Sequence, residues 1–292
     1  MCRCHPDQVQ RPVKLSNAAV GAQEGCQVSR WIVDNMPAWL VLIALLVVIA
    51  GGAVVLLIVL RRRYPRLAGD SHNDATRFAF GVICIVYAFL TGFMASSLWS
   101  QINTEDDQAR TEGAVGVQLA RDRAVFDSGD SDRIRQALLD YERAALSEWP
   151  KVADGQHSDP AADKALKRLY VAYEQVQPRT DIQRSFLATS LANLDRLSQA
   201  RTARVVQAQM DSGPPWSLWS VILLTSVMVV GCAVVYGVEE PRLHYAMVAT
   251  VAVLVAANLF LILELAHPYV GEIATSPQPL RDVVDVLLEP AT

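Results

Sequence analysis

Four long runs of apolar residues without a formal charge stand out in the pattern of hydrophobic and polar positions along the chain. They cover residues 39–60, 78–99, 216–238 and 245–263. An α-helix rises about 1.5 Å per residue, so about 20 apolar residues are needed to cross about 30 Å of hydrocarbon. Tryptophan or tyrosine lies at the edges of these runs, as is typical of a membrane surface. The pattern therefore predicts four membrane-spanning helices.

The alternative for these runs is a set of buried helices in a soluble bundle, but such helices seldom exceed about 14 unbroken apolar residues. The composition also favours a membrane protein, because 52% of the residues are hydrophobic and 19% are charged. A soluble domain has about 25% charged residues. Helices satisfy their own backbone hydrogen bonds in lipid, so all four spans are predicted to be helical.

The segment between the second and third runs, residues 100–213, has the polar composition of a soluble domain and a helical spacing of apolar residues. The second span is expected to continue as a helix through residues 101–126. The next helix is expected to end at Pro150. Its buried face would contain Ile134, Leu138, Tyr141, Ala145 and Trp149. The predicted fold class is all-α, with four transmembrane helices and a helical extramembrane domain inserted between spans two and three.

Two further helices in this segment have start signals. Asp159 is a predicted N-cap with Pro160 at the first helical position. The buried face of that helix would contain Leu166, Leu169, Tyr170 and Tyr173. Thr180 and Gln183 form a capping box at the start of a long helix. Its apolar face is expected to contain Ile182, Phe186, Leu191, Leu194 and Leu197.

The chain is predicted to divide into parts with different surroundings. These are a disordered or wrongly started N-terminal tail (1–36), spans one and two (37–99), the helical domain (100–213), spans three and four (214–266) and a C-terminal tail (267–292). The last part carries an apolar stripe that predicts a short amphipathic helix. The stripe consists of Leu280, Val283, Val284, Leu287 and Leu288. This helix would dock on the helical domain or lie on the bilayer surface, and both alternatives remain open.

The placement of arginine predicts the orientation in the membrane. The loop between spans one and two contains Arg61, Arg62, Arg63, Arg66 and Arg77. Arg242 lies in the short loop between spans three and four. Positively charged short loops favour the cytoplasmic side. The protein is therefore expected to be a multi-pass protein of the cell membrane, with its helical domain outside the cytoplasm.

Motifs of enzymes and cofactor sites are absent from the sequence. HExxH, paired CxxC, GxGxxG, GxxxxGK[ST] and GxSxG strings do not occur, so no catalytic residue, metal ligand or cofactor is predicted and an enzyme is not expected. Cys2, Cys4, His5 and Cys26 do not have the spacing of a zinc site. The net charge of −4 and the lack of a long basic run disfavour nucleic-acid binding.

Bulky apolar side chains recur every four residues in the second span. Ile85, Phe89 and Phe93 share one helix face, which continues toward Ser96. Such a stripe forms a narrow apolar gate if several copies surround an axis; otherwise it is ordinary helix packing. These four residues are the candidates for lining a pore.

Two polar residues in the fourth span are further candidates. Glu264, at the end of the span, would contact an ion or proton path, or it would mark an interfacial helix end. Asn258 lies nearer the middle of the membrane and would line a pore or bond between helices.

Several strings, taken in order, resemble the bestrophin-like domain family of bacterial membrane proteins. They are HNDATRFAFGVICIVYAFLTGF (72–93), SEWP (147–150), LDRLSQARTAR (194–204), GVEEPRLHYAM (237–247) and LILELAHPYVG (261–271). The resemblance covers about residues 37 to 287. It implies a pentamer that conducts anions through a pore lined by the second span, where Ile85, Phe89 and Phe93 match the apolar neck by spacing. It also implies a helical domain in the cytosol, opposite to the orientation that the arginines predict.

The expected function is that of a bestrophin-like integral membrane protein that acts as an oligomeric ion channel. Its partners would be the lipid bilayer, further copies of the same chain and anions. The alternative is a membrane-anchored sensory or scaffolding protein whose helical domain binds a ligand or a partner.

Overall fold

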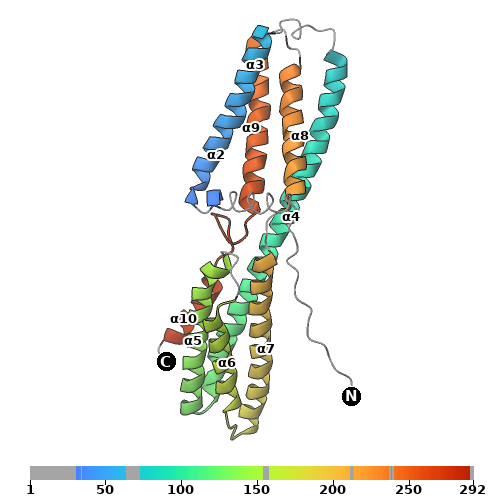
Figure 1. Cartoon of the computed structure of the whole chain (residues 1–292). Helices are drawn as coiled ribbons and strands as arrows, with labels where there is room; N and C mark the ends of the chain where they lie inside the picture. The colour runs from blue at the N-terminus through green and yellow to red at the C-terminus, as the bar shows by residue number, and fades with distance from the viewer. Residues whose placement is uncertain are drawn as a thin grey trace, which may run out of the picture.

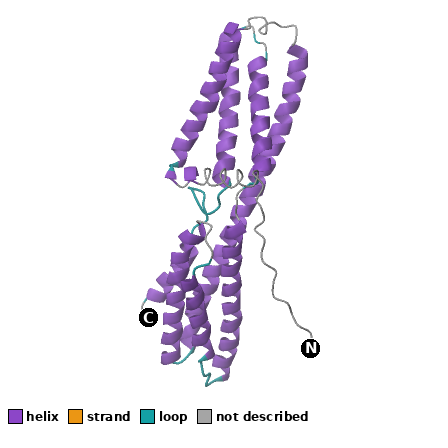
Figure 2. Ribbon diagram, in the orientation of Figure 1, coloured by secondary structure: helices purple, strands orange, loops and turns teal. Residues whose placement is uncertain are grey.

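A computed structural model describes residues 31–33, 35–63, 73–153, 158–210, 214–236, 238 and 240–289, except for the side chains of residues 73–77, 209 and 210. The cysteines and the histidine of the predicted N-terminal tail lie outside these residues. Helices make up the regular structure of the described part, which contains no strand (Figure 2). The all-α fold class is therefore confirmed.

Four helical rods are long and apolar enough to cross a membrane. The first rod runs through α2 (Ala38–Leu46), the wide π-helical turn η1 (Val47–Gly51) and α3 (Gly52–Arg63). The others are α4 (Asn73–Asp122), α8 (Trp216–Val235) and α9 (Pro241–Leu265). Each rod coincides with one of the apolar runs, which confirms the prediction of four membrane-spanning helices. We call the first rod, α8, α9 and residues 73–104 of α4 the membrane bundle.

The rest of α4 belongs to a second group of helices, which we call the polar bundle. It consists of residues 105–122 of α4, the short turn η4 (Arg123–Val125), and four further helices. These are α5 (Ser128–Ala153), α6 (Pro160–Glu174), α7 (Asp181–Met210) and α10 (Gln278–Leu288). The two bundles lie end to end and α4 runs through both (Figure 1). This helix packs against α8 and α9 in one bundle and against α7 and α10 in the other.

The surfaces of the bundles differ as their surroundings require. The membrane bundle exposes large apolar side chains such as Val48 and Val227, which are 69% and 68% exposed. Contact with lipid tails removes the cost that water would impose on such a surface. The polar bundle instead has an apolar interior in which Ile134, Leu138 and Leu169 are completely buried.

The predicted start signals of two polar-bundle helices are present. The Asp159 carboxylate accepts a hydrogen bond from the Ala161 backbone N–H at 2.9 Å, so Asp159 is the N-cap of α6. At the start of α7, the Gln183 backbone N–H donates to the Thr180 hydroxyl at 3.1 Å. The Gln183 side chain reaches back to the Arg179 N–H at 2.7 Å. These bonds satisfy helix-end donors that would otherwise need water.

Two details of the predicted helices are wrong. Pro150 does not end α5, which continues to Ala153. The proline ring removes one hydrogen bond in the last turn, while buried Trp149 and Val152 hold this turn against the core.

At the start of α7, Ile182 and Phe186 do not lie in the core, because they are 66% and 37% exposed. The Gln183 amide instead faces the core side, where it donates to the Val125 carbonyl at 3.2 Å. This bond turns the neighbouring Ile182 outward. Farther along α7, Leu194 and Leu197 are fully buried as predicted.

The open question about the C-terminal amphipathic helix is settled for the isolated chain. Helix α10 packs on α4 and α5, and its Leu280, Val283 and Leu287 side chains are completely buried. The Arg135 Nε also donates to the Leu287 carbonyl at 2.9 Å. Most of the apolar stripe therefore faces the polar bundle, whereas Leu288 at its end is 50% exposed.

Candidate functional site

The pore-lining candidates lie on a face of α4 that no other helix in the described part of the chain covers. Ile85, Phe89 and Phe93 are 71%, 77% and 67% exposed, and Ser96 is also exposed. Four-residue steps on a helix place these side chains above one another. The structure thus brings all four candidates together on one continuous stripe, which we call the α4 stripe.

The opposite face of α4 is buried. Tyr87, Met94 and Leu98 are 4%, 6% and 7% exposed, and they pack with Ile222 of α8 and Leu259 of α9. This packing fixes the rotation of α4 about its axis. The α4 stripe must therefore face whatever surrounds the single chain, which is lipid, another protein surface or a water-filled space between copies.

The α4 stripe becomes polar as it leaves the apolar part of the helix. Beyond Ser96, the α4 stripe continues in steps of three or four residues through the exposed positions Ser100, Asn103 and Asp107. One exposed helix face therefore changes from bulky apolar groups to hydroxyl, amide and carboxylate groups along its length. An ion path with an apolar gate has such a change, since ions enter from water and then meet a narrow dry segment.

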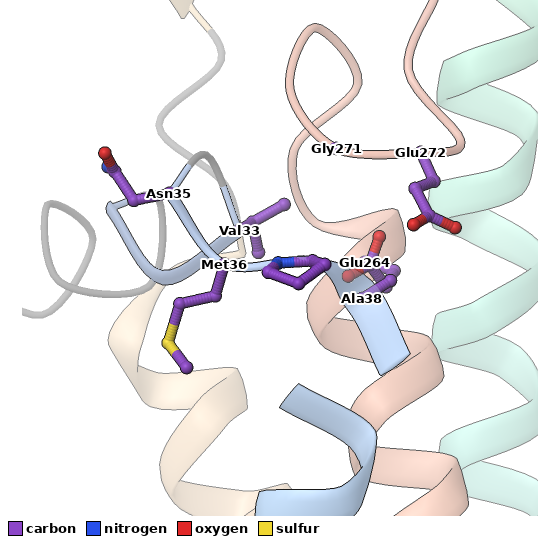
Figure 3. A pocket seen from close by; sticks show the side chains of 8 residues that line it. Val33, Asn35, Met36, Ala38, Glu264, Gly271 and Glu272 are labelled. Atoms are coloured by element: carbon purple, nitrogen blue, oxygen red, sulfur yellow. The ribbon is translucent and has the colours of Figure 1, made fainter. Parts of the chain in front are cut away.

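Glu264 lies in a different place, at the end of α9 that faces the polar bundle. It borders a cavity of about 290 Å³ that is lined by Val33, Met36 and Glu272, among others, and by no residue of α4 (Figure 3). Its side chain is 3% exposed, and its Oε2 has no hydrogen-bond partner among the described residues. The structure does not bring Glu264 to the α4 stripe.

The loop after α9 approaches Glu264 closely at Gly271. This glycine has a φ of 98°, a conformation that side chains disfavour. A Cβ there would lie 2.8 Å from the Val33 side chain and 3.1 Å from Glu264 Oε2.

No group of three potential metal ligands occurs among the described residues. The structure supplies no complete metal site around Glu264.

Asn258 neither joins the α4 stripe nor bonds to a neighbouring helix through its amide donor. Its Nδ2 donates to the Leu254 carbonyl of the same helix at 3.0 Å. The bond satisfies one of the amide's two N–H donors within α9.

A buried charged network in the polar bundle was missed by the sequence reasoning. Arg204 of α7 is 1% exposed and Glu112 of α4 is fully buried. The Arg204 Nε donates to Glu112 Oε2 at 2.8 Å, and Nη2 donates to Oε1 at 3.2 Å. The Tyr141 hydroxyl also donates to Glu112 Oε1 at 2.7 Å. Three helices are thereby joined at one carboxylate.

A second buried arginine binds next to the first. Arg201 donates to both oxygens of Glu148 at 3.0 and 2.7 Å, and its Nη1 lies 2.8 Å from Asp163 of α6. Such two-point pairs are stronger than single hydrogen bonds. Together, Arg201 and Arg204 balance the charge of the buried Glu112 and Glu148.

Ionisation in this network follows from burial and charge. Burial alone would lower the pKa of Arg204, but attraction to Glu112 raises that pKa above its ordinary value. Burial raises the pKa of Tyr141 well above its ordinary value, and the Glu112 and Glu142 carboxylates raise it further. Arg204 therefore stays charged. Tyr141 stays protonated and uses its hydroxyl proton in the hydrogen bond to Glu112.

The network extends by ring contacts to the junction of the two bundles. The Arg204 guanidinium lies 5.0 Å from the centre of the Trp149 ring. Trp149 contacts the edge of Tyr269 at 6.0 Å between centroids. The Tyr269 hydroxyl donates to Glu105 of α4. Tyr269 lies in the segment between α9 and α10, so the charged network is connected to the end of α9.

The sequence matches the Bestrophin-like domain over residues 47–280, which is most of the chain. The chain belongs to the bestrophin-like family. The resemblance inferred from the ordered motifs is therefore confirmed. No curated protein matches the sequence.

Solved structures of bacterial bestrophins have a similar fold. A point mutant of a bacterial bestrophin homologue from Klebsiella pneumoniae superposes with a TM-score of 0.65 at 13% identity, covering 85% of this chain and 99% of that chain. A second point mutant of that homologue gives a TM-score of 0.64 at 14% identity, covering 85% and 97%. At such low identity these likenesses show the fold alone.

Proposed function

We propose that this bestrophin-like protein is an oligomeric ion channel in which the α4 stripes of several copies surround a pore. The observation that carries the proposal is the exposed stripe of Ile85, Phe89 and Phe93 on a helix whose other face is packed. The change to Ser96, Ser100 and Asn103 along the same face supports it. Family membership agrees with it, and the resemblance to bestrophins suggests five subunits.

The apolar part of the α4 stripe would act as the gate. A ring of Phe89 and Phe93 side chains leaves water no hydrogen-bonding partner, so a narrow segment empties and excludes ions. A small outward movement of α4 would widen and rewet it. The packed face of α4 would transmit movement from α8 and α9.

Replacing Phe89 by alanine is expected to raise ion flux in liposomes severalfold, because a smaller side chain widens and wets the proposed gate. Flux is measured with purified protein and an ion-sensitive dye. The control is Val55→Ala on α3, since Val55 is also an exposed apolar residue, at 59%, but lies away from the α4 stripe. Equal flux in both variants and the unmodified protein, or flux no higher than in empty liposomes, would contradict the proposal.

The proposed ions are anions, on the resemblance alone. Exposed Asp107 on the polar part of the α4 stripe would oppose anion entry. Reversal potentials in a potassium chloride gradient distinguish conduction of anions from conduction of cations. A potential near that of chloride supports anion conduction, whereas a potential near that of potassium overturns it and leaves the channel in place.

We further propose that the polar bundle lies outside the bilayer and on the extracytoplasmic side of the cell membrane. The short loop with five arginines supports this orientation, while the bestrophin resemblance implies the reverse. Ser158→Cys and Ser71→Cys, each in a cysteine-free background, are treated with a membrane-impermeant thiol reagent on intact cells. We expect labelling at Ser158 alone; labelling at Ser71 alone would overturn the orientation.

A further inference from the structure

Glu142 of α5 is a buried acid that the network around Arg204 does not use. Its side chain is completely buried, and neither carboxylate oxygen has a hydrogen-bond partner among the described residues. An ionised carboxylate in such a place would cost several kcal/mol or more. A carboxyl group that keeps its proton avoids most of that cost.

The C-terminal helix lies close to this carboxyl group. The point where a Cβ on Gly116 of α4 would lie is 2.8 Å from Glu142 Oε1 and 2.9 Å from Val283 Cγ2 of α10. The glycine therefore leaves room for Glu142 and Val283 to meet against α4. On α10 the contact is apolar, since the charged side chains of Arg281, Asp282 and Asp285 are exposed.

Among the described residues, no cation donates a hydrogen bond to Glu142. The titratable groups near it are Glu112 of α4, Arg204 of α7 and the neutral Tyr141 hydroxyl of its own helix. Arg204 directs Nε to Glu112 at 2.8 Å and Nη2 toward Glu148 at 3.6 Å. Its Nη1 and both Glu142 oxygens have no hydrogen-bond partner among the described residues. Burial raises the pKa of Glu142 well above its ordinary value, Glu112 raises it further, and Arg204 opposes the shift.

We propose that Glu142 is a proton-operated latch for α10: the helix docks while the Glu142 carboxyl group holds a proton and is released when that proton is lost. The proposal concerns docking within one chain and does not require that the protein conducts ions. Release of α10 would give the carboxylate access to water.

The direction of the pH dependence follows from the raised pKa. A proton is taken up when α10 docks, so docking is unaffected below the pKa of the water-exposed carboxyl group. Above that pKa the docking equilibrium falls by up to about tenfold per pH unit, until the raised pKa of the docked state is reached. Alkaline pH therefore weakens docking.

Release of α10 is the easiest way to hydrate Glu142. Helix α10 has 11 residues and packs on α4 and α5, whereas α4, α5 and α7 are joined to one another by the Arg204 network. Opening the bundle between those helices would separate several buried ion pairs. Undocking α10 exposes three apolar side chains and leaves those pairs intact.

Hydrogen exchange measured by mass spectrometry on the full-length protein in detergent tests the latch. Peptides from α10 and α6 are compared at about pH 5 and about pH 9, with labelling times corrected for intrinsic exchange. The variants are Glu142→Gln, which resembles the protonated acid, and Glu174→Gln, the same change at an exposed position on α6. Gly113→Leu serves as the undocked reference, because a Cβ there would lie 2.5 Å from the Pro279 carbonyl oxygen.

In the unmodified protein and in Glu174→Gln, α10 is expected to lose protection by about tenfold or more at the higher pH while α6 keeps it. In Glu142→Gln, α10 should remain protected at both pH values. The proposal is overturned if the unmodified protein shows no loss at α10, if Glu142→Gln loses protection to the same extent, or if α6 opens together with α10. The comparison of α10 with α6 in the unmodified protein decides the matter even if Glu142→Gln does not fold.

Discussion

Replacing Arg204 by alanine is expected to lower the free energy of unfolding of the polar bundle by about 3–5 kcal/mol. The substitution removes the guanidinium that binds both oxygens of buried Glu112 and stacks on Trp149. Glu112 would keep the Tyr141 hydrogen bond but would lose its positive partner. The free energy is obtained from hydrogen exchange of α6 peptides in detergent.

Arg184→Ala is the matched control, because Arg184 also lies on α7 and pairs with an acid. The side chains of Arg184 and Asp181 are 69% and 95% exposed. Exposed pairs contribute at most about 1 kcal/mol, because water and salt screen them. If Arg204→Ala were no more destabilising than Arg184→Ala, the buried network would not hold the polar bundle together.

The membrane part of the fold could be predicted well because the physical demand is simple. Lipid requires long uncharged helices, and the sequence shows them directly as runs of about 20 residues. The continuity of α4 through both bundles was also predictable, since no proline or glycine pair interrupts residues 94–112. Helix caps at Asp159 and Thr180 depend on neighbouring residues alone, so the sequence predicts them locally.

The Arg204 network was harder to predict because its residues are charged. Arg201 and Arg204 follow Leu194 and Leu197 at helical spacing, so they occupy core positions of α7. A pattern that records hydrophobic residues does not show that a charged residue is buried. The spacing was a usable signal, but the acids that pair with these arginines come from other helices.

The docking of α10 depended on information that the amphipathic stripe does not contain. Leu280, Val283 and Leu287 show that one face of the helix is apolar, and they do not say what it faces. The structure adds the partner, which is the close approach to Gly113 and Gly116 on α4. Small residues permit such packing, but their spacing alone does not identify the helix that fills the space.

The candidate pore residues illustrate a related limit. Spacing alone groups Ile85, Phe89 and Phe93 on one face of α4. The structure adds that this face is exposed and that the opposite face packs against α8 and α9. Lipid tails and further copies of the chain both cover apolar side chains, so exposure in one chain is compatible with either surrounding.

Disulfide crosslinking at Phe89 separates these two surroundings most directly. In a background without other cysteines, Phe89→Cys is oxidised in membranes and compared with Val55→Cys, whose position on α3 is also exposed. If the α4 helices of several copies surround an axis, Phe89→Cys will form covalent dimers between copies and Val55→Cys will remain monomeric. Monomers from Phe89→Cys, with the protein otherwise folded, would show that the α4 stripe faces lipid and would contradict the proposed pore.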